Sequence, residues 1–65
     1  MSRERIIATK LRQLRGDKSR EEVADAVGVS PSAWGMYESG HRVPRDDAKI
    51  RIANYFGVPI QDIFY

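Results

Sequence analysis

Apolar residues recur at helical spacing in five short stretches of the chain, and glycine or proline separates each stretch from the next. In the first stretch, Ile7, Leu11 and Leu14 fall on one helical face. No stretch alternates apolar and polar residues with the β-branched enrichment that is typical of strands. The pattern therefore predicts an all-α fold, a compact five-helix domain with helices of about 6–13 residues.

The ends of these stretches carry capping signals. Serine is the expected N-cap of the first three helices, and a proline follows the third of these serines at the first helical position. The second helix opens with a capping box, Ser19-Arg20-Glu21-Glu22. Glycine closes four of the five stretches. The predicted helices lie over residues 3–15, 20–27, Pro31 to a stop at Ser39-Gly40, within 44–56, and 59–64.

Only Gly28-Val29-Ser30 joins the second predicted helix to the third. Two helices linked so closely must cross at a steep angle, which needs small residues near the corner. Ala24 is small where the helices would meet, and Gly28 can adopt a positive φ at the turn. This spacing is typical of a helix-turn-helix motif. Apolar residues occupy the other positions that would face the core: Val23, Val27, Val29, Trp34 and Tyr37.

The composition narrows the class of protein. A chain of 65 residues and 7.4 kDa predicts one domain over residues 1–65. Hydrophobic residues at 42% and charged residues at 31% are typical of a globular protein. The chain begins with methionine and ends in a predicted helix, as expected for a whole small protein, although a shortened domain would look the same.

The sequence lacks the residues that disulfide formation, metal binding and the common kinds of catalysis need. There is no cysteine for a disulfide or a thiol nucleophile, and the single histidine, His41, has no second histidine with which to bind a metal. No Ser/His/Asp set, carboxylate pair with a pocket or phosphate loop can be assembled. We therefore expect no enzyme, no cofactor, no metal and no small-molecule substrate. Apolar runs of at most three residues predict no membrane segment, and the N-terminus does not resemble a signal peptide, so a cytoplasmic location is expected.

The net charge of +2 is unevenly distributed. Residues 1–15 hold five basic side chains against one acidic side chain, a local charge of +4. With a sequence pI near 9.3, this permits a polyanionic partner, although many small soluble proteins are mildly basic without one.

The motifs together resemble the XRE/Cro-like family of phage-repressor-type helix-turn-helix domains. The resemblance covers residues 6–64 and implies a five-helix domain that binds double-stranded DNA, usually as a dimer, and regulates transcription. The residues that carry it are Leu14-Arg15, Glu21-Glu22-Val23-Ala24, Gly28-Val29-Ser30, Tyr37-Glu38-Ser39-Gly40, Arg42-Val43-Pro44-Arg45-Asp46, Ile52-Ala53-Asn54-Tyr55-Phe56-Gly57-Val58 and Asp62-Ile63-Phe64.

The resemblance also implies which residues contact DNA. Groove-facing positions of the third helix are Pro31, Ser32, Ala33, Gly35 and Met36, and expected backbone contacts are Arg20, Ser30, His41, Arg42 and Arg45. None of the groove-facing residues is Arg, Lys, Gln or Asn, the side chains best suited to bidentate base readout, so modest readout is predicted. This chain also departs from the family by an arginine at position 20, where glutamine is common, and by a link before the second helix that is about two residues shorter.

Several residues have competing interpretations. Trp34 and Tyr37 could stack on bases, but their spacing favours the core. Glu38 is expected to pair with Arg15, and Arg20 contacts phosphate or instead pairs with an acid close to it in sequence. Gly35 allows close approach to DNA or makes room beside a neighbouring tryptophan. The basic residues of the first helix are expected to form a solvated face rather than a second binding surface: Arg3, Arg5, Lys10 and Arg12.

These observations lead to one principal hypothesis, a DNA-binding transcriptional repressor with the third helix in the major groove. The alternative is a protein-interaction or antitoxin-like module that keeps the fold with weak base readout. We also predict a homodimer, at least on DNA, through residues 55–65, where Ile60, Ile63, Phe64 and Tyr65 exceed what a short helix can bury. The surplus best placed for a partner is Tyr65 with one side of Ile60. The alternative is that these groups close the monomer's own core.

Overall fold

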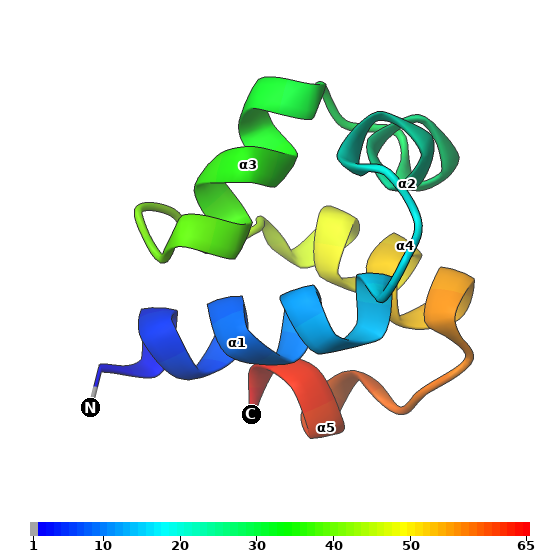
Figure 1. The fold of residues 1–65 in the computed structure, drawn as a ribbon. Coiled ribbons are helices and arrows are strands. Elements are labelled where there is room, and N and C mark those ends of the chain that lie inside the picture. The colour runs from blue at the N-terminus through cyan, green and yellow to red at the C-terminus, as the bar shows by residue number, and fades with distance from the viewer. Residues whose placement is uncertain (1) are drawn as a thin grey trace.

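The computed structural model describes residues 2–65, which fold into five α-helices and contain no strand (Figure 1). The helices are α1 Arg3–Arg15, α2 Arg20–Val27, α3 Pro31–Ser39, α4 Asp46–Phe56 and α5 Ile60–Phe64. The all-α, five-helix prediction is therefore confirmed, with boundaries that differ from the predicted ones by at most two residues. Within the described residues, no helix combines the length and apolar character needed to cross a lipid bilayer.

Helix α1 lies between two layers of the fold. It packs against α3 on one side and α5 on the other, while α2 packs against α3 and α4. In Figure 1, α2 and α3 stand above α1, and α5 lies beneath it. This arrangement leaves the side of α3 that faces away from α1 and α2 open to solvent.

One apolar cluster draws on all five helices. Trp34 lies at its centre, with an edge-to-face contact to Tyr37 at 6.3 Å between ring centroids and Phe56 at the same distance. Trp34 is fully buried and Tyr37 nearly so, which confirms that both belong to the core. The buried members are Ile7, Leu11, Val23, Ala24, Val27, Trp34, Tyr37, Ile52, Ala53, Ile63 and Phe64.

Serine side chains cap the first three helices, as predicted. Ser2 Oγ accepts from the Arg5 amide at 3.3 Å, and Ser19 Oγ accepts from the Glu22 amide at 3.0 Å. Each bond satisfies a backbone N–H that has no partner inside its helix. Helices α4 and α5 begin without a side-chain cap.

The α2–α3 corner depends on Gly28. Its φ of 77° and ψ of 33° are left-handed, a conformation that a side chain disfavours. The Gly28 amide donates to the Asp25 carbonyl at 3.3 Å, and the Val29 amide donates to the Ala24 carbonyl at 3.0 Å. This pair of bonds is a Schellman motif, which ends α2 and turns the chain toward α3 within three residues.

The C-terminal helix closes the core of the monomer. Ile63 and Phe64 are each 2% exposed, and Ile60 is half-buried against the same cluster. Ile63 and Phe64 therefore close the monomer's own core, whereas Ile60 keeps part of its surface exposed. Tyr65 is 64% exposed, and its hydroxyl accepts from Lys49 Nζ at 3.2 Å.

Candidate functional site

The structure brings the ten predicted contact residues to one region, formed by α2, α3 and the α3–α4 loop. Two of them, Ala33 and Gly35, are half-buried, and Ala33 packs against the core. The other eight are exposed: Arg20, Ser30, Pro31, Ser32, Met36, His41, Arg42 and Arg45. The region is therefore available to a partner along nearly its whole length.

We call Pro31, Ser32, Gly35 and Met36 the outer face of α3, since all four lie on the side of the helix away from the core. None of the four is charged, and only Met36 has a long side chain, which is 46% exposed. Ser30 caps the start of this face by accepting from the Ala33 amide at 3.0 Å. The outer face can therefore be approached closely by a ligand.

Gly35 is not required by the fold. It lies inside a helix, and it is absent from the glycines with positive φ in residues 2–65. A Cβ built on it meets nothing within 4 Å apart from its own helix backbone and its chain neighbours, Trp34 and Met36. A glycine in a helix interior costs about 1 kcal/mol relative to alanine. Both predicted explanations, close approach to DNA and room beside Trp34, stay predictions.

A buried carboxylate joins α3 to α1 and α2. Glu38 is 2% exposed, and its Oε2 accepts from Arg15 Nε at 2.6 Å and from Trp34 Nε1 at 2.6 Å. Its Oε1 accepts from Arg15 Nη2 at 3.2 Å and from Arg20 Nε at 3.1 Å. The predicted pair of Arg15 and Glu38 is confirmed. Each oxygen accepts two hydrogen bonds, and these replace the water that the charged carboxylate loses on burial.

These contacts decide the ionisation of Glu38. Burial by itself would raise its pKa, but hydrogen bonds from Arg15 and Trp34 and the charge of Arg15 outweigh burial and hold the pKa below its ordinary value. The hydrogen bond to Glu38 likewise raises the pKa of Arg15. The carboxylate therefore stays charged at neutral pH and locks the third helix to the first.

Arg20 has a partner that the sequence did not indicate. The expected alternatives to phosphate contact were Asp17 or a neighbouring glutamate, but its Nε bonds to Glu38, 18 residues along the chain. The side chain is still 55% exposed. Two guanidinium groups thus share one carboxylate, and the cluster of Arg15, Arg20 and Glu38 keeps a net charge of +1 at the surface.

Sequence reasoning also missed three further bonds in this region. Trp34 donates to Glu38 one helical turn along, a spacing that could have suggested the contact. Arg12 Nη1 donates to the Glu38 backbone carbonyl, and Arg12 Nη2 donates to Thr9 Oγ1 at 3.1 Å. No local pattern connects Arg12 to Glu38, because the crossing of α1 with α3 creates that contact.

The loop after α3 presents more basic groups. His41 Nδ1 hydrogen bonds with Ser39 Oγ at 2.7 Å, and Ser39 Oγ donates to the Met36 carbonyl at 3.1 Å. Pro44 is buried, which anchors the middle of the loop. Arg42 and Arg45 on either side of it are exposed. The loop therefore holds two cations beside the end of α3.

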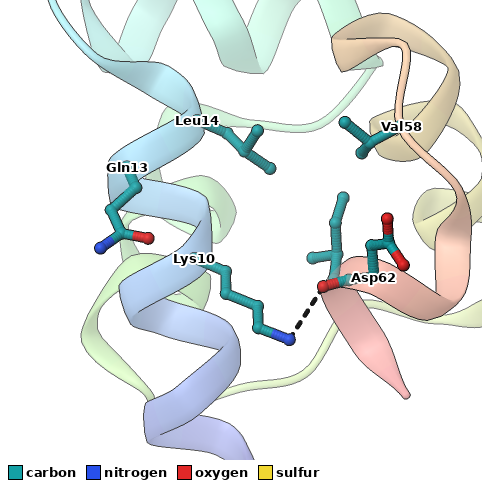
Figure 2. Close-up of a pocket in the computed structure, with 6 residues that line it drawn as sticks. Lys10, Gln13, Leu14, Val58 and Asp62 are labelled. Atoms are coloured by element: carbon teal, nitrogen blue, oxygen red, sulfur yellow. Dashed lines mark hydrogen bonds between the residues drawn. The ribbon is translucent and has the colours of Figure 1, made fainter.

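A hollow of about 260 Å³ lies elsewhere, between α1 and the α4–α5 turn (Figure 2). At its edge, Lys10 Nζ donates to the Asp62 carbonyl at 2.8 Å, which ties α1 to α5. Lys10 is thus a bridging residue rather than part of a merely solvated face. The hollow is lined by Lys10, Gln13, Leu14, Val58, Asp62 and Ile63, and none of the ten predicted contact residues reaches it.

Comparisons with known proteins agree with this geometry. A family model described as a helix-turn-helix domain matches residues 6–63. The cryptic phage CTXphi transcriptional repressor RstR of Vibrio cholerae is 33% identical over 60 residues, which cover 89% of this chain and 54% of the relative. The chain thus spans about half the length of that relative.

A solved structure is also similar. The solution structure of the SOS-response transcriptional repressor LexA from Eubacterium rectale matches with a TM-score of 0.90 and 25% sequence identity. The match covers 97% of this chain and 69% of that one. Together with the family model, this match confirms the predicted resemblance to repressor-type domains. The chain belongs to the helix-turn-helix domain family.

Proposed function

We propose that this chain binds double-stranded DNA through α3 and represses transcription. The observation that carries the proposal is the α2–turn–α3 unit, whose outer face is open, with exposed arginines at the start of α2 and in the loop after α3. An uncharged outer face can lie against the base edges in the major groove. The nearby cations can bind the phosphates of the DNA backbone. The relative RstR is a transcriptional repressor, which supports the same role.

The phosphate contacts would set the position of α3 in the groove. The cluster of Arg15, Arg20 and Glu38 offers one uncompensated positive charge at the start of α2. The start of α3 offers the Ser32 backbone N–H and the positive end of the helix dipole, because Pro31 has no N–H and the Ala33 amide donates to Ser30 Oγ. His41, Arg42 and Arg45 supply contacts on the other side. Such contacts position a protein without specifying sequence.

Base readout would be modest. Ser32 can hydrogen bond to a base edge, and Met36 can contact a thymine methyl group. Ala33 is turned toward the core, which reduces what it can reach. Sequence-dependent DNA shape would add to the discrimination.

We further propose a homodimer on DNA, because two copies on a two-fold axis would read two half-sites about one helical turn apart. Within residues 55–65, the exposed aromatic groups are Tyr55, at 36% exposure, and Tyr65, at 64%. A repressor must reach its DNA, which supports a cytoplasmic location. Sedimentation with and without duplex tests the dimer. One protein per duplex at saturation would contradict it.

Selection of bound duplexes from a random pool, repeated at several salt concentrations, tests the function. We expect an enriched motif and an affinity that falls steeply with added salt, because phosphate contacts release counterions. The same experiment tests the alternative, a protein-interaction module, which is favoured by the absence of Arg, Lys, Gln and Asn from the outer face. No enrichment together with weak, salt-insensitive duplex affinity would support that alternative.

A further inference from the structure

A second hollow lies between α1 and the C-terminal end of α3. Its volume is about 320 Å³, and its lining is mainly polar. Two arginines and two hydroxyl groups line it, together with one buried alanine: Arg5, Thr9, Arg12, Ser39 and Ala8. No acidic residue contributes to the lining. The hollow therefore holds two positive charges with no acidic residue beside them.

The geometry around Arg12 keeps its charge available. Arg12 donates to the Glu38 backbone carbonyl and to Thr9 Oγ1, and both acceptors are neutral. Among residues 2–65, neither Arg12 nor Arg5 forms an ion pair with a carboxylate. The guanidinium of Arg12 is thus held in place without being neutralised, which is the arrangement that recognises an anion.

The hollow adjoins the α3–α4 loop. A Cβ built on Gly40 would lie 3.6 Å from Arg5 Cγ and 3.7 Å from Arg5 Cα, so Arg5 packs against the end of α3. Ser39, on the rim of the hollow, hydrogen bonds with His41 in the loop. Figure 1 shows the N-terminal half of α1 beside this loop. The hollow therefore lies next to the start of the α3–α4 loop, where His41 stands.

We propose that this hollow binds a backbone phosphate of the DNA duplex, with Arg5 and Arg12 as its cationic donors. The hydroxyl groups of Thr9 and Ser39 line the hollow but already donate to the Arg5 and Met36 carbonyls. The proposal rests on the proposed function. It divides the four basic residues of α1 that were expected to form a solvated face. Arg5 and Arg12 face α3, whereas Arg3 and Lys10 line a different hollow with Ile6 and Tyr65.

That division supplies a matched control. Arg5→Gln and Arg3→Gln each remove one positive charge from an exposed position near the start of α1. They change the net charge of the protein equally, so any difference between them reports on location. Arg12 is left unchanged, because its bond to the Glu38 carbonyl also holds α1 against α3.

The experiment measures the dissociation constant of each protein for a random-sequence duplex over a range of salt concentrations, since phosphate contacts do not depend on sequence. We expect Arg5→Gln to make the slope of log affinity against log salt shallower by about one, and Arg3→Gln to leave it near the wild-type slope. Thermal melting of both variants verifies that each is folded.

Two results would overturn the proposal in different ways. A steep wild-type slope with the same slope in both variants would leave duplex binding intact and show that no phosphate occupies the hollow. A wild-type protein without salt-dependent duplex affinity would overturn the proposed function and this phosphate site together.

Discussion

The two faces of α3 differ in how far the fold dictates their residues. On the inner face, Trp34, Tyr37 and Glu38 are buried, and the indole and the carboxylate are bonded to each other. On the outer face, Pro31, Ser32 and Met36 are exposed, and Gly35 has open space where a Cβ would stand. Nine residues of one helix thus divide into a tightly constrained half and a nearly unconstrained half.

The difference separates stability from function. A residue that contacts three helices cannot change without disturbing all of them, as with Glu38 between α1, α2 and α3. A residue that contacts nothing inside the protein is free to be chosen for what it meets outside. Gly35 makes this point most clearly, because in isolation the domain would be more stable with alanine there.

The largest effect is expected at the centre of the inner face. Trp34→Ala should cost about 3–5 kcal/mol, which is close to the whole stability of so small a domain. Thermal melting should show an unfolded or barely folded protein. Met36→Ala, on the outer face of the same helix, is the control and should change stability by about 0.5 kcal/mol or less. A melting temperature of Trp34→Ala near that of the wild type would contradict the comparison.

Glu38→Gln should lower the free energy of unfolding by about 3 kcal/mol, because it leaves the Arg15 guanidinium without its counter-charge in a part-buried site. The wild type should also lose stability in acid. The pKa of Glu38 in the folded protein lies below the ordinary value of 4.5, so its contribution is complete above that pH and is lost as pH falls through the lowered folded value. Chemical denaturation at several pH values measures both effects.

The variant provides the check on this assignment. In Glu38→Gln, the free energy of unfolding should fall less between neutral and acid pH than it does in the wild type. Asp47→Asn removes an exposed carboxylate paired with Arg51. It should reduce this pH dependence by a smaller amount than Glu38→Gln does. Equal slopes for the wild type and Glu38→Gln would show that this carboxylate does not drive the acid sensitivity.

Gly35→Ala should raise the stability of the protein and lower its affinity for duplex DNA. The free energy of unfolding should rise by about 1 kcal/mol, because alanine is the better helix former and its methyl group meets nothing in the protein. Duplex affinity should fall about tenfold, equivalent to about 1.4 kcal/mol, because the methyl group stands where DNA approaches. Melting and binding titrations measure the pair. Unchanged affinity in the stabilised variant would remove Gly35 from the interface.

The smallest effects on folding are expected at the flanking arginines. Arg20→Ala and Arg42→Ala should each weaken binding to all duplexes about equally and make the salt slope shallower by about one. Arg20→Ala should cost at most about 1 kcal/mol of stability, since its side chain is 55% exposed and the pair of Arg15 and Glu38 remains. Unchanged slopes in both variants would reject this docking of α2 and the loop.

Most of the fold could be predicted because its signals are local. Ser2, Ser19 and Ser30 bond to amides three residues ahead, and Gly28 bonds to the turn before it. Interactions of such short range can be predicted from the spacing of residues in the sequence. The outline of the site could be predicted for a related reason, since the short α2–α3 link leaves few ways for the two helices to cross.

The exceptions all involve residues that are far apart in sequence. Arg20 bonds to Glu38, Arg5 packs against Gly40, and Lys10 bonds to the Asp62 carbonyl. The helical periodicity predicts that these polar side chains face outward, but it does not predict which helix lies beside them.

The sequence by itself determined the number, type and limits of the helices, the helix-turn-helix corner and the residues at the centre of the core. Only the tertiary structure decided how the charges are shared and which apolar groups of α5 are buried. The physical reason is range. Helix formation and capping depend on neighbours within about four residues, whereas the Glu38 cluster and the polar hollow of α1 form only after packing of the core has set how α1 and α3 cross.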